Sequence, residues 1–337
     1  MGDQGLPFLE VVDLKKYFPV QHGLLEQLLS RKQSFVKAVD GVTFSLAKGD
    51  IFGLVGESGS GKTTTGRLTI GLIRPTSGKI TLDGIELGRL DSSGIRKLRR
   101  RMQIIFQDPT ASLNPKMRVG DAVADPLKLL ESTDGEETRR RVLEIFEYVG
   151  LVPAAEIYRR YPQNLSGGQK QRVVIARALV THPDYVVADE PVAMVDVSVR
   201  AQILDVMRGM HTRLGLTYLF ITHDLAVAKY LCNRIAIMYL GKIAEMGDTK
   251  DVFGLPLHPY TRALLAAVPV PDPSAKRQKT IPRGEIPNAI NPPAGCRFNP
   301  RCPYATDICR TEEPLLRNVD KSRPNHVAAC HWAEKFL

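Results

Sequence analysis

Long apolar runs are missing from this sequence. No stretch reaches about eighteen apolar residues, the length that a membrane-spanning helix needs. Residues 1–10 also lack the basic, apolar and small-residue pattern of a cleavable signal. We therefore expect a chain that does not cross a membrane by itself. Any transport role would require a channel made by other subunits.

Basic motifs interleaved with aromatic residues are also missing, although the charge balance is basic. The sequence has 46 Lys and Arg against 36 Asp and Glu, a net charge of +10 and a pI near 9.4. This balance alone would suit nucleic acid or an anionic membrane surface. The basic runs at 96–101 and 139–141 have helical spacing beside apolar positions, which favours solvated helix faces. We predict no nucleic-acid partner.

A glycine-rich segment follows the apolar run 51–55 and precedes a predicted helix. It reads Gly56, Glu57, Ser58, Gly59, Ser60, Gly61, Lys62, Thr63, Thr64. This is the G-x4-G-K-T pattern in which backbone N–H groups and a helix N-terminus surround phosphate oxygens. Lys62 is expected to reach the β and γ phosphates, and Thr63 to bind Mg²⁺. The pattern predicts a phosphate-binding loop.

Two further patterns narrow the class of nucleotide protein. The first is a predicted helix start with a cap and a glycine pair, at Ser166, Gly167, Gly168 and Gln169. The second is the apolar strand 185–188, which ends in Asp189 and Glu190. Carboxylates at the carboxyl end of a buried strand can meet Mg²⁺ and water. We assign Asp189 to the metal and Glu190 to the general base.

With these motifs in order, residues 8–267 resemble the ATP-binding subunits of ABC transporters. The resemblance implies an α/β fold, a P-loop NTPase core with an antiparallel β subdomain and an α-helical subdomain at about 110–182. Gln107 matches the glutamine that contacts Mg²⁺, Asp196 the D-loop acid and His223 the switch histidine. Glu190, His223 and Lys62 are then the catalytic residues of an ATPase.

The resemblance also implies how ATP is shared between subunits. The signature residues Ser166 and Gly168 would cap ATP held by a second, head-to-tail ATPase subunit, identical or paralogous. Two transmembrane permease subunits would receive the motion, and an extracytoplasmic binding protein would deliver the cargo. This places the chain on the cytoplasmic face of the membrane. Adenine is expected to stack on Tyr17 or Phe18.

Cysteines gather near the end of the chain, after a proline-rich stretch. Residues 268–293 have linker composition, and 294–337 hold Cys296, Cys302, Cys309 and Cys330. Four clustered thiols in a cytosolic protein suit a metal or redox chemistry, with an iron-sulfur cluster, zinc and reduced thiols all open. We expect His326 and His331 to be surface or capping residues rather than ligands. Residues 19–34 form an insertion without a derived role.

The tail narrows the resemblance to one group of importers. His258-Pro-Tyr260, the linker and the run from Cys296 to Pro303 are similar to oligopeptide and dipeptide importers, whose members can carry a [4Fe-4S] cluster. We thus predict a small cysteine-rich module with that cluster, zinc being second. Peptide import is the expected function. Nickel or oligosaccharide import, or a soluble ABC ATPase of iron-sulfur assembly, are the alternatives.

Overall fold

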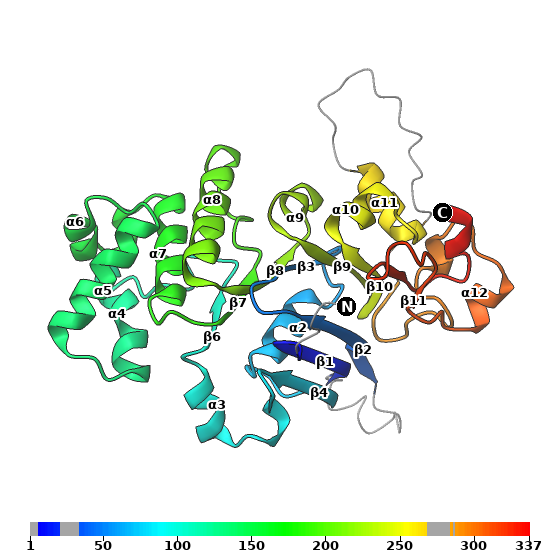
Figure 1. The fold of residues 1–337 in the computed structure, drawn as a ribbon, viewed down its shortest axis with the longest axis horizontal. Helices are drawn as coiled ribbons and strands as arrows, with labels where there is room; N and C mark the ends of the chain where they lie inside the picture. Colours follow the sequence, from blue (N-terminus) through cyan, green and yellow to red (C-terminus); the bar gives the residue numbers. More distant parts are fainter. Residues whose placement is uncertain (1–5, 21–33, 268–283, 286) are drawn as a thin grey trace, which may run out of the picture.

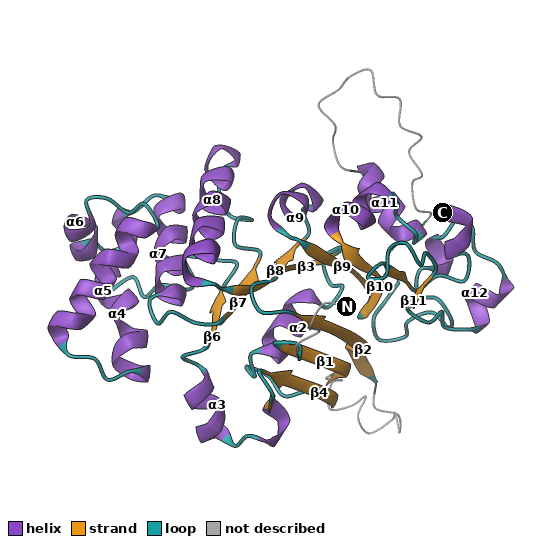
Figure 2. Ribbon diagram, viewed as in Figure 1, coloured by secondary structure: helices purple, strands orange, loops and turns teal. Residues whose placement is uncertain are grey.

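The computed structural model describes residues 6–20, 34–267, 284–285 and 287–337 of the 337-residue chain. Most of the predicted insertion 19–34 and of the predicted linker 268–293 lies outside the described residues. The ribbon places a helical group at one end, two sheets in the middle and the C-terminal residues at the other end (Figure 1). Helices and strands alternate through the middle, as an α/β fold requires (Figure 2).

The main sheet has eight strands in the order β11-β12-β10-β9-β3-β8-β7-β6. Five neighbours, β9-β3-β8-β7-β6, run parallel, whereas β10, β12 and β11 pair antiparallel. The bounds of these strands are β3 Ile51–Val55, β6 Met102–Ile105, β7 Tyr185–Asp189, β8 Thr217–Thr222, β9 Arg234–Tyr239, β10 Lys242–Asp248, β11 Arg317–Asn318 and β12 Val327–Ala328.

The central strands are buried on both faces because each face has its own apolar core. In β3, Phe52 and Leu54 point into one core, whereas Ile51 and Val55 point into the other. Continuous apolar strands of this kind are typical of parallel sheets covered on both sides. The side chain of Phe52 stacks on Phe44 at 5.3 Å between ring centroids and so joins the main sheet to the second one.

The second sheet is antiparallel and has the order β2-β1-β4-β5. Its strands are β1 Leu9–Pro19, β2 Phe35–Leu46, β4 Ser77–Leu82 and β5 Ile85–Glu86, followed by the short helices η1 Leu87–Arg89 and α3 Ser92–Leu98. The helix α2 Lys62–Thr69 lies between the two sheets (Figure 1). This sheet is the predicted antiparallel β subdomain, and its strands β1 and β2 form one side of the region around α2.

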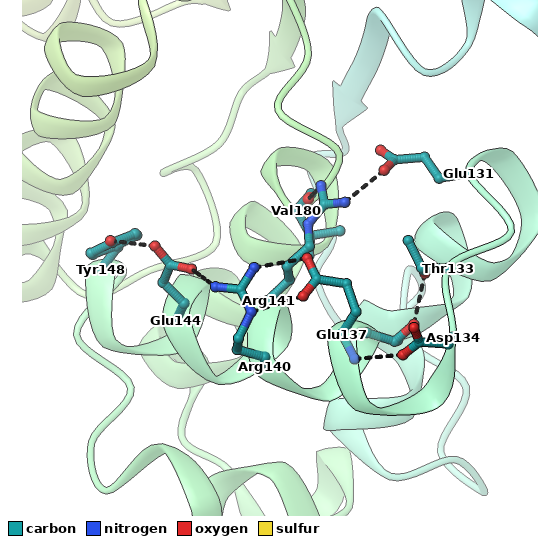
Figure 3. A network of polar contacts seen from close by, with 10 residues as sticks. Glu131, Thr133, Asp134, Glu137, Arg140, Arg141, Glu144, Tyr148 and Val180 are labelled. Atoms are coloured by element: carbon teal, nitrogen blue, oxygen red, sulfur yellow. Dashed lines mark hydrogen bonds and ion pairs between the residues drawn. The ribbon is translucent and has the colours of Figure 1, made fainter.

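Helices form the end of the molecule beyond β6 (Figure 1). They are α4 Val119–Leu130, α5 Gly135–Tyr148, α6 Ala154–Arg159, η2 Pro162–Asn164 and α7 Gly167–Leu179. Arg141 of α5 donates to Glu131 Oε2 and to the carbonyl of Val180, both at 2.6 Å, which joins α5 to the ends of α4 and α7 (Figure 3). Arg140 pairs with Glu137 on the outer face. The contacts of Arg141 thus hold α7 in place against α4 and α5.

The remaining helices follow the later strands. They are α8 Val197–Leu214, α9 Leu225–Leu231, α10 Thr249–Gly254, α11 Pro259–Ala267, η3 Asn299–Arg301, α12 Asp307–Thr311 and η4 Ala333–Phe336. Among the described residues, no helix has both the length and the apolar character needed to cross a membrane.

The C-terminal residues pair with the main sheet. Strand β12 pairs with β10 through Glu245 and Met246, so these residues extend the main sheet. His326, expected at the surface, is instead fully buried, and its Nε2 lies 2.7 Å from Glu245 Oε1. The expectation failed because the residues around His326 give no sign of a partner 81 positions earlier in the sequence.

Candidate functional site: the carboxyl edge of the parallel strands

The predicted nucleotide residues meet because parallel strands end at the same edge of the sheet. The glycine-rich loop follows β3, Gln107 follows β6, Glu190 follows β7 and His223 follows β8. Together they line a cleft of about 780 Å³. Its walls also include Val36, Ala38, Thr64, Leu264 and Ala289. This is the place where open α/β sheets bind ligands.

The loop from Gly56 to Gly61 has a backbone that only glycine fits at two points. Gly61 has φ 102°, and a Cβ there would lie 2.1 Å from the carbonyl oxygen of Ala38. Gly56 has φ 159° and its Cβ would lie 2.1 Å from the carbonyl oxygen of Met238. The loop is therefore packed tightly between β2 and the end of β9. The helix α2 follows this loop directly, and the first N–H groups of a helix have no helical partners, an arrangement that binds anions.

Lys62 is buried at the start of α2 and bends back along the loop. Its ammonium donates to the carbonyls of Gly56 and Glu57, both at 2.8 Å, and to Ser60 Oγ at 3.3 Å. Burial lowers the pKa of Lys62, and the nearby carboxylates of Glu190, Asp189 and Glu57 partly oppose this. A cation held by backbone carbonyls can turn toward phosphate with little movement of the chain.

Three polar contacts arrange the side chains at the ends of β7 and β8. Thr63 donates its hydroxyl to Asp189 Oδ1 at 2.9 Å. The two oxygens of Glu190 have different partners: Gln107 Nε2 donates to Oε2 at 3.2 Å, and His223 Nδ1 lies 3.0 Å from Oε1. Burial raises the pKa of Asp189, with the Thr63 bond opposing the change.

Glu190 is held in an uncommon backbone conformation, with φ 48°. Its N–H donates to the carbonyl of Ile221 at 2.9 Å, which ties the turn after β7 to β8. Residues with positive φ that are not glycine are strained and tend to occur at functional sites. Strain, two side-chain partners and a position in the cleft all mark Glu190 as the central carboxylate of this site.

Similarity to known proteins agrees with this geometry. A family model described as ABC transporter matches residues 39–193, and one described as oligopeptide/dipeptide transporter, C-terminal region, matches 244–309. The dipeptide transport ATP-binding protein DppF of Haemophilus influenzae is 46% identical, covering 93% of this chain and 94% of its own. The oligopeptide transport ATP-binding protein AppF of Bacillus subtilis is 44% identical over 96% of both chains.

The chain belongs to the ATP-binding proteins of ABC transporters. It is therefore an ATP-binding cassette ATPase with a C-terminal region of the oligopeptide/dipeptide type. The fold is also found in a dimeric, post-hydrolysis structure of the ATP-binding cassette MJ0796 bound to ADP and Pi. The TM-score is 0.62 at 28% identity, covering 72% of this chain and 98% of the other.

In this protein, the signature residues Ser166 and Gly168 lie apart from the cleft. Ser166 caps α7: its hydroxyl accepts the N–H of Gln169, whose side-chain oxygen accepts the N–H of Ser166. Gly168 is close to α8, since a Cβ there would lie 2.7 Å from Val199 Cγ1. None of these residues, nor the exposed Asp196 that precedes α8, lines the cleft around Lys62.

The predicted adenine-stacking residues lie on β1 and outside the lining of the cleft. Tyr17 donates its hydroxyl to Asp40, and Phe18 is about one-third exposed, 38%, with the ammonium of Lys16 over its ring. Their partner strand β2 supplies Val36 and Ala38 to the cleft wall. Stacking of adenine on either ring stays a prediction.

The iron-sulfur prediction is wrong. Within the described residues, no group of three or more His, Cys, Asp or Glu side chains is placed to hold a metal ion. Burial raises the pKa of the Cys296 thiol to about 12 and of the Cys330 thiol to about 11. Cys302 and Cys309 are also free. The thiols pack with aromatic rings such as Phe298 and Trp332, where protonated sulfur acts as an apolar group.

Sequence reasoning missed three residues next to the loop. Tyr260 accepts the N–H of Glu57 at 3.0 Å, and Arg301 pairs with the Glu57 carboxylate at 2.9 Å. Arg297 donates to Asp40 and to the carbonyl of Leu240. The sequence did single out the segments that contain Tyr260, Arg297 and Arg301, but only as marks of a family. No local pattern shows that they reach the loop.

Proposed function

We propose that this chain is the ATP-hydrolysing subunit that powers an importer of oligopeptides or dipeptides. The observation that carries the proposal is similarity at 44–46% identity over nearly the whole chain to proteins named for peptide transport. The match to the oligopeptide/dipeptide C-terminal region supports it. Nickel and oligosaccharide import and iron-sulfur assembly have no such support, because the named relatives are peptide transport proteins.

Hydrolysis of ATP requires a positioned water and a stabilised phosphoryl group rather than covalent chemistry. Glu190 is the proposed base that orients this water. Gln107 and His223 hold one carboxylate oxygen each, and this fixes the direction of the lone pairs. His223 is mostly exposed and can turn from Glu190 to the γ phosphate. Lys62 would leave the loop carbonyls to offset the charge that develops on the β and γ phosphates.

The donor set at the loop fits Mg²⁺. Thr63 offers a hydroxyl and Asp189 a carboxylate 2.9 Å apart, and Gln107 offers an amide oxygen from the neighbouring strand end. These are the oxygen ligands that Mg²⁺ prefers. The ion, when bound with ATP, neutralises charge on the β and γ oxygens. We propose that Thr63, Asp189 and Gln107 hold it, directly or through water.

We propose a head-to-tail dimer in which each signature segment completes the partner's cleft. Ser166 and Gly167 are exposed at the start of α7, where a helix N-terminus favours an anion. Exposed Met194 and Val197 lie beside Asp196 and would be covered by a second subunit. The dimeric structures of the ATP-binding cassette MJ0796 support this assembly. Whether the partner is identical or a paralogue, its glycine-rich loop would face Ser166.

The remaining partners follow from the importer proposal. Two transmembrane permease subunits would bind the helical group α4–α7 from the cytoplasmic face of the membrane. A substrate-binding protein outside the cell would deliver the peptide. We also keep the division into residues 8–267, with its helical part at about 110–182, 268–293 and 294–337 as a functional proposal. The cassette would supply ATP chemistry, and the last segment would be specific to this importer type.

The test is uptake of a labelled peptide, in the presence of the substrate-binding protein, by vesicles that contain the full chain, its partner ATPase and both permeases. We expect Glu190→Gln to bind ATP but to lose steady-state turnover and uptake together. Glu312→Gln, an exposed change far from the cleft, is the control and should keep both. Steady-state hydrolysis that survives Glu190→Gln would remove this residue from the mechanism. Uptake of nickel or an oligosaccharide in place of peptides would refute the proposal that the cargo is a peptide.

A further inference from the structure

An arginine near the C-terminus reaches the nucleotide loop. Arg301 Nη1 lies 2.9 Å from Glu57 Oε2 and Nη2 lies 3.3 Å from Glu57 Oε1. The two hydrogen bonds run side by side between a guanidinium and a carboxylate that are 244 residues apart in sequence. Such two-point pairs fix direction as well as distance, because both groups are planar. Glu57 is the second residue of the loop and lines the cleft.

The guanidinium of Arg301 is itself held in place. The residue is 8% exposed, and its Nη1 also lies 3.4 Å from the Tyr239 hydroxyl. Its carbon centre is 5.9 Å from the Tyr239 ring and 5.8 Å from the Phe298 ring. Phe298 packs on Tyr260 at 5.4 Å between centroids. An arginine surrounded in this way cannot follow a moving carboxylate, so Glu57 must stay where Arg301 is.

Glu57 is fixed at its backbone as well as at its side chain. Its N–H donates to the Tyr260 hydroxyl at 3.0 Å, and its carbonyl accepts from Lys62 Nζ at 2.8 Å. The Glu57 carboxylate, N–H and carbonyl therefore belong to one connected set of contacts that runs from Arg301 to the Lys62 ammonium. The Arg301 charge also offsets that of Glu57, which would otherwise repel phosphate across the cleft.

A second arginine of the same segment supports the other side of the loop. Arg297 donates to Asp40 on β2 and to the carbonyl of Leu240 in the turn between β9 and β10. In that turn, the N–H of Gly241 donates to the carbonyl of Ser60 at 2.9 Å. Residues 296–302 thus touch the first part of the loop through Arg301 and its last part through the 240–241 turn.

We infer that Arg301 is a positioning residue for nucleotide binding, which holds Glu57 and through it the loop and Lys62 in the shape that receives phosphate. The inference rests on the proposed function, since it assumes that ATP binds at this loop. It gives the C-terminal region a role in the ATP chemistry of its own subunit. Arg301 does not touch the nucleotide and acts only through Glu57.

The experiment is an equilibrium titration of the full chain with ADP and Mg²⁺, together with the KM and kcat for ATP. Arg301→Gln should weaken nucleotide binding by about three- to ten-fold, the size expected when one member of a coupled network is lost. KM should rise by a similar factor, with a smaller change in kcat. Arg301→Lys should recover part of the affinity, because it restores the charge but not the two-point pair.

Glu57→Ala separates positioning from a merely structural role. If Arg301 acts through Glu57, Glu57→Ala should weaken binding to a similar degree, and adding Arg301→Gln to it should cost less than about two-fold more. An equal loss from Arg301→Gln with and without Glu57 would overturn the inference and leave Arg301 as a support of the fold. If Arg301→Gln does not fold, Glu57→Ala alone tests the inference: an affinity for ADP equal to that of the wild type would overturn it.

Two controls keep the outcomes distinct. Arg310→Gln removes an exposed arginine that pairs with Asp307 of the same helix, and it should leave binding unchanged. Lys62→Ala should abolish binding if ATP occupies this loop. If the wild-type chain does not bind nucleotide, or Lys62→Ala binds as well as wild type, the proposed function fails and the inference fails with it. Normal wild-type binding with no effect of Arg301→Gln or Glu57→Ala overturns the inference alone.

Discussion

The buried side chain of His258 is expected to make the stability of this protein depend on pH. Its ring is buried, Nδ1 accepts the N–H of Tyr260 at 3.0 Å, and burial lowers its pKa from 6.5 to about 4. The neighbouring Glu245 carboxylate already accepts the N–H groups of Leu257 and His258 and a contact from His326. Protonation of Nδ1 would remove the acceptor for Tyr260, the residue that holds the Glu57 N–H.

The sign and size follow from the two pKa values. The unfolded chain binds a proton at His258 near pH 6.5 and the folded chain only near pH 4, so stability is lost as the pH falls through this window. Between pH 7 and pH 5 the loss from this one histidine is about 2 kcal/mol. An unfolding entropy of about 0.7 kcal/mol/K for a chain of 337 residues converts this into a Tm shift of about 3 °C.

The assay compares thermal unfolding of wild type and His258→Asn at pH 7, 6 and 5. An Asn side-chain oxygen can accept the N–H of Tyr260 as His258 Nδ1 does, but Asn does not titrate. Every other group titrates in both proteins, so the difference between them isolates His258. We expect wild type to lose about 3 °C more than the variant between pH 7 and pH 5. Equal losses would refute the assignment of a buried neutral His258.

Two further predictions concern the loop and the signature helix. Gly61→Ala should abolish nucleotide binding, because the added Cβ would meet the Ala38 carbonyl. Gly59 has open space around it, so Gly59→Ala should weaken binding only by the cost of the positive φ, about 1–2 kcal/mol. Equal effects of the two changes in an ADP titration would contradict this. Ser166→Ala should lower the free energy of unfolding by about 1 kcal/mol, and Ser166→Thr, which keeps a hydroxyl to cap α7, should restore it. Urea titration measures both values. An unchanged free energy of unfolding in Ser166→Ala would count against the capping role of Ser166.

Local pattern was enough to place the residues of the cleft together but not the residues that support them. The glycine-rich loop, Glu190 and His223 could be placed from sequence because each directly follows an apolar strand, and parallel strands bring such ends together. The pairs Arg301–Glu57 and His326–Glu245 join positions 244 and 81 residues apart, and no period or spacing encodes them.

The cysteine prediction failed for a physical reason. Four thiols close in sequence suggest four metal ligands, but spacing does not show whether the sulfurs face one point as thiolates. In the fold, burial raises the pKa of the Cys296 and Cys330 thiols, and both thiols pack against aromatic rings. Clustering showed correctly that the cysteines share one region of the molecule. It could not distinguish an apolar thiol cluster from a metal centre.

The pairing of β12 with β10 has a consequence for the smallest unit that can fold. A chain ended after α11 would look complete by its motifs, because every nucleotide residue precedes residue 268. Yet it would expose the edge of β10, and Glu245 would lose His326 while staying among buried groups. The shortened chain would also lack Arg297 and Arg301. Exchanging tails between relatives would therefore require matched residues at positions 245, 57 and 40.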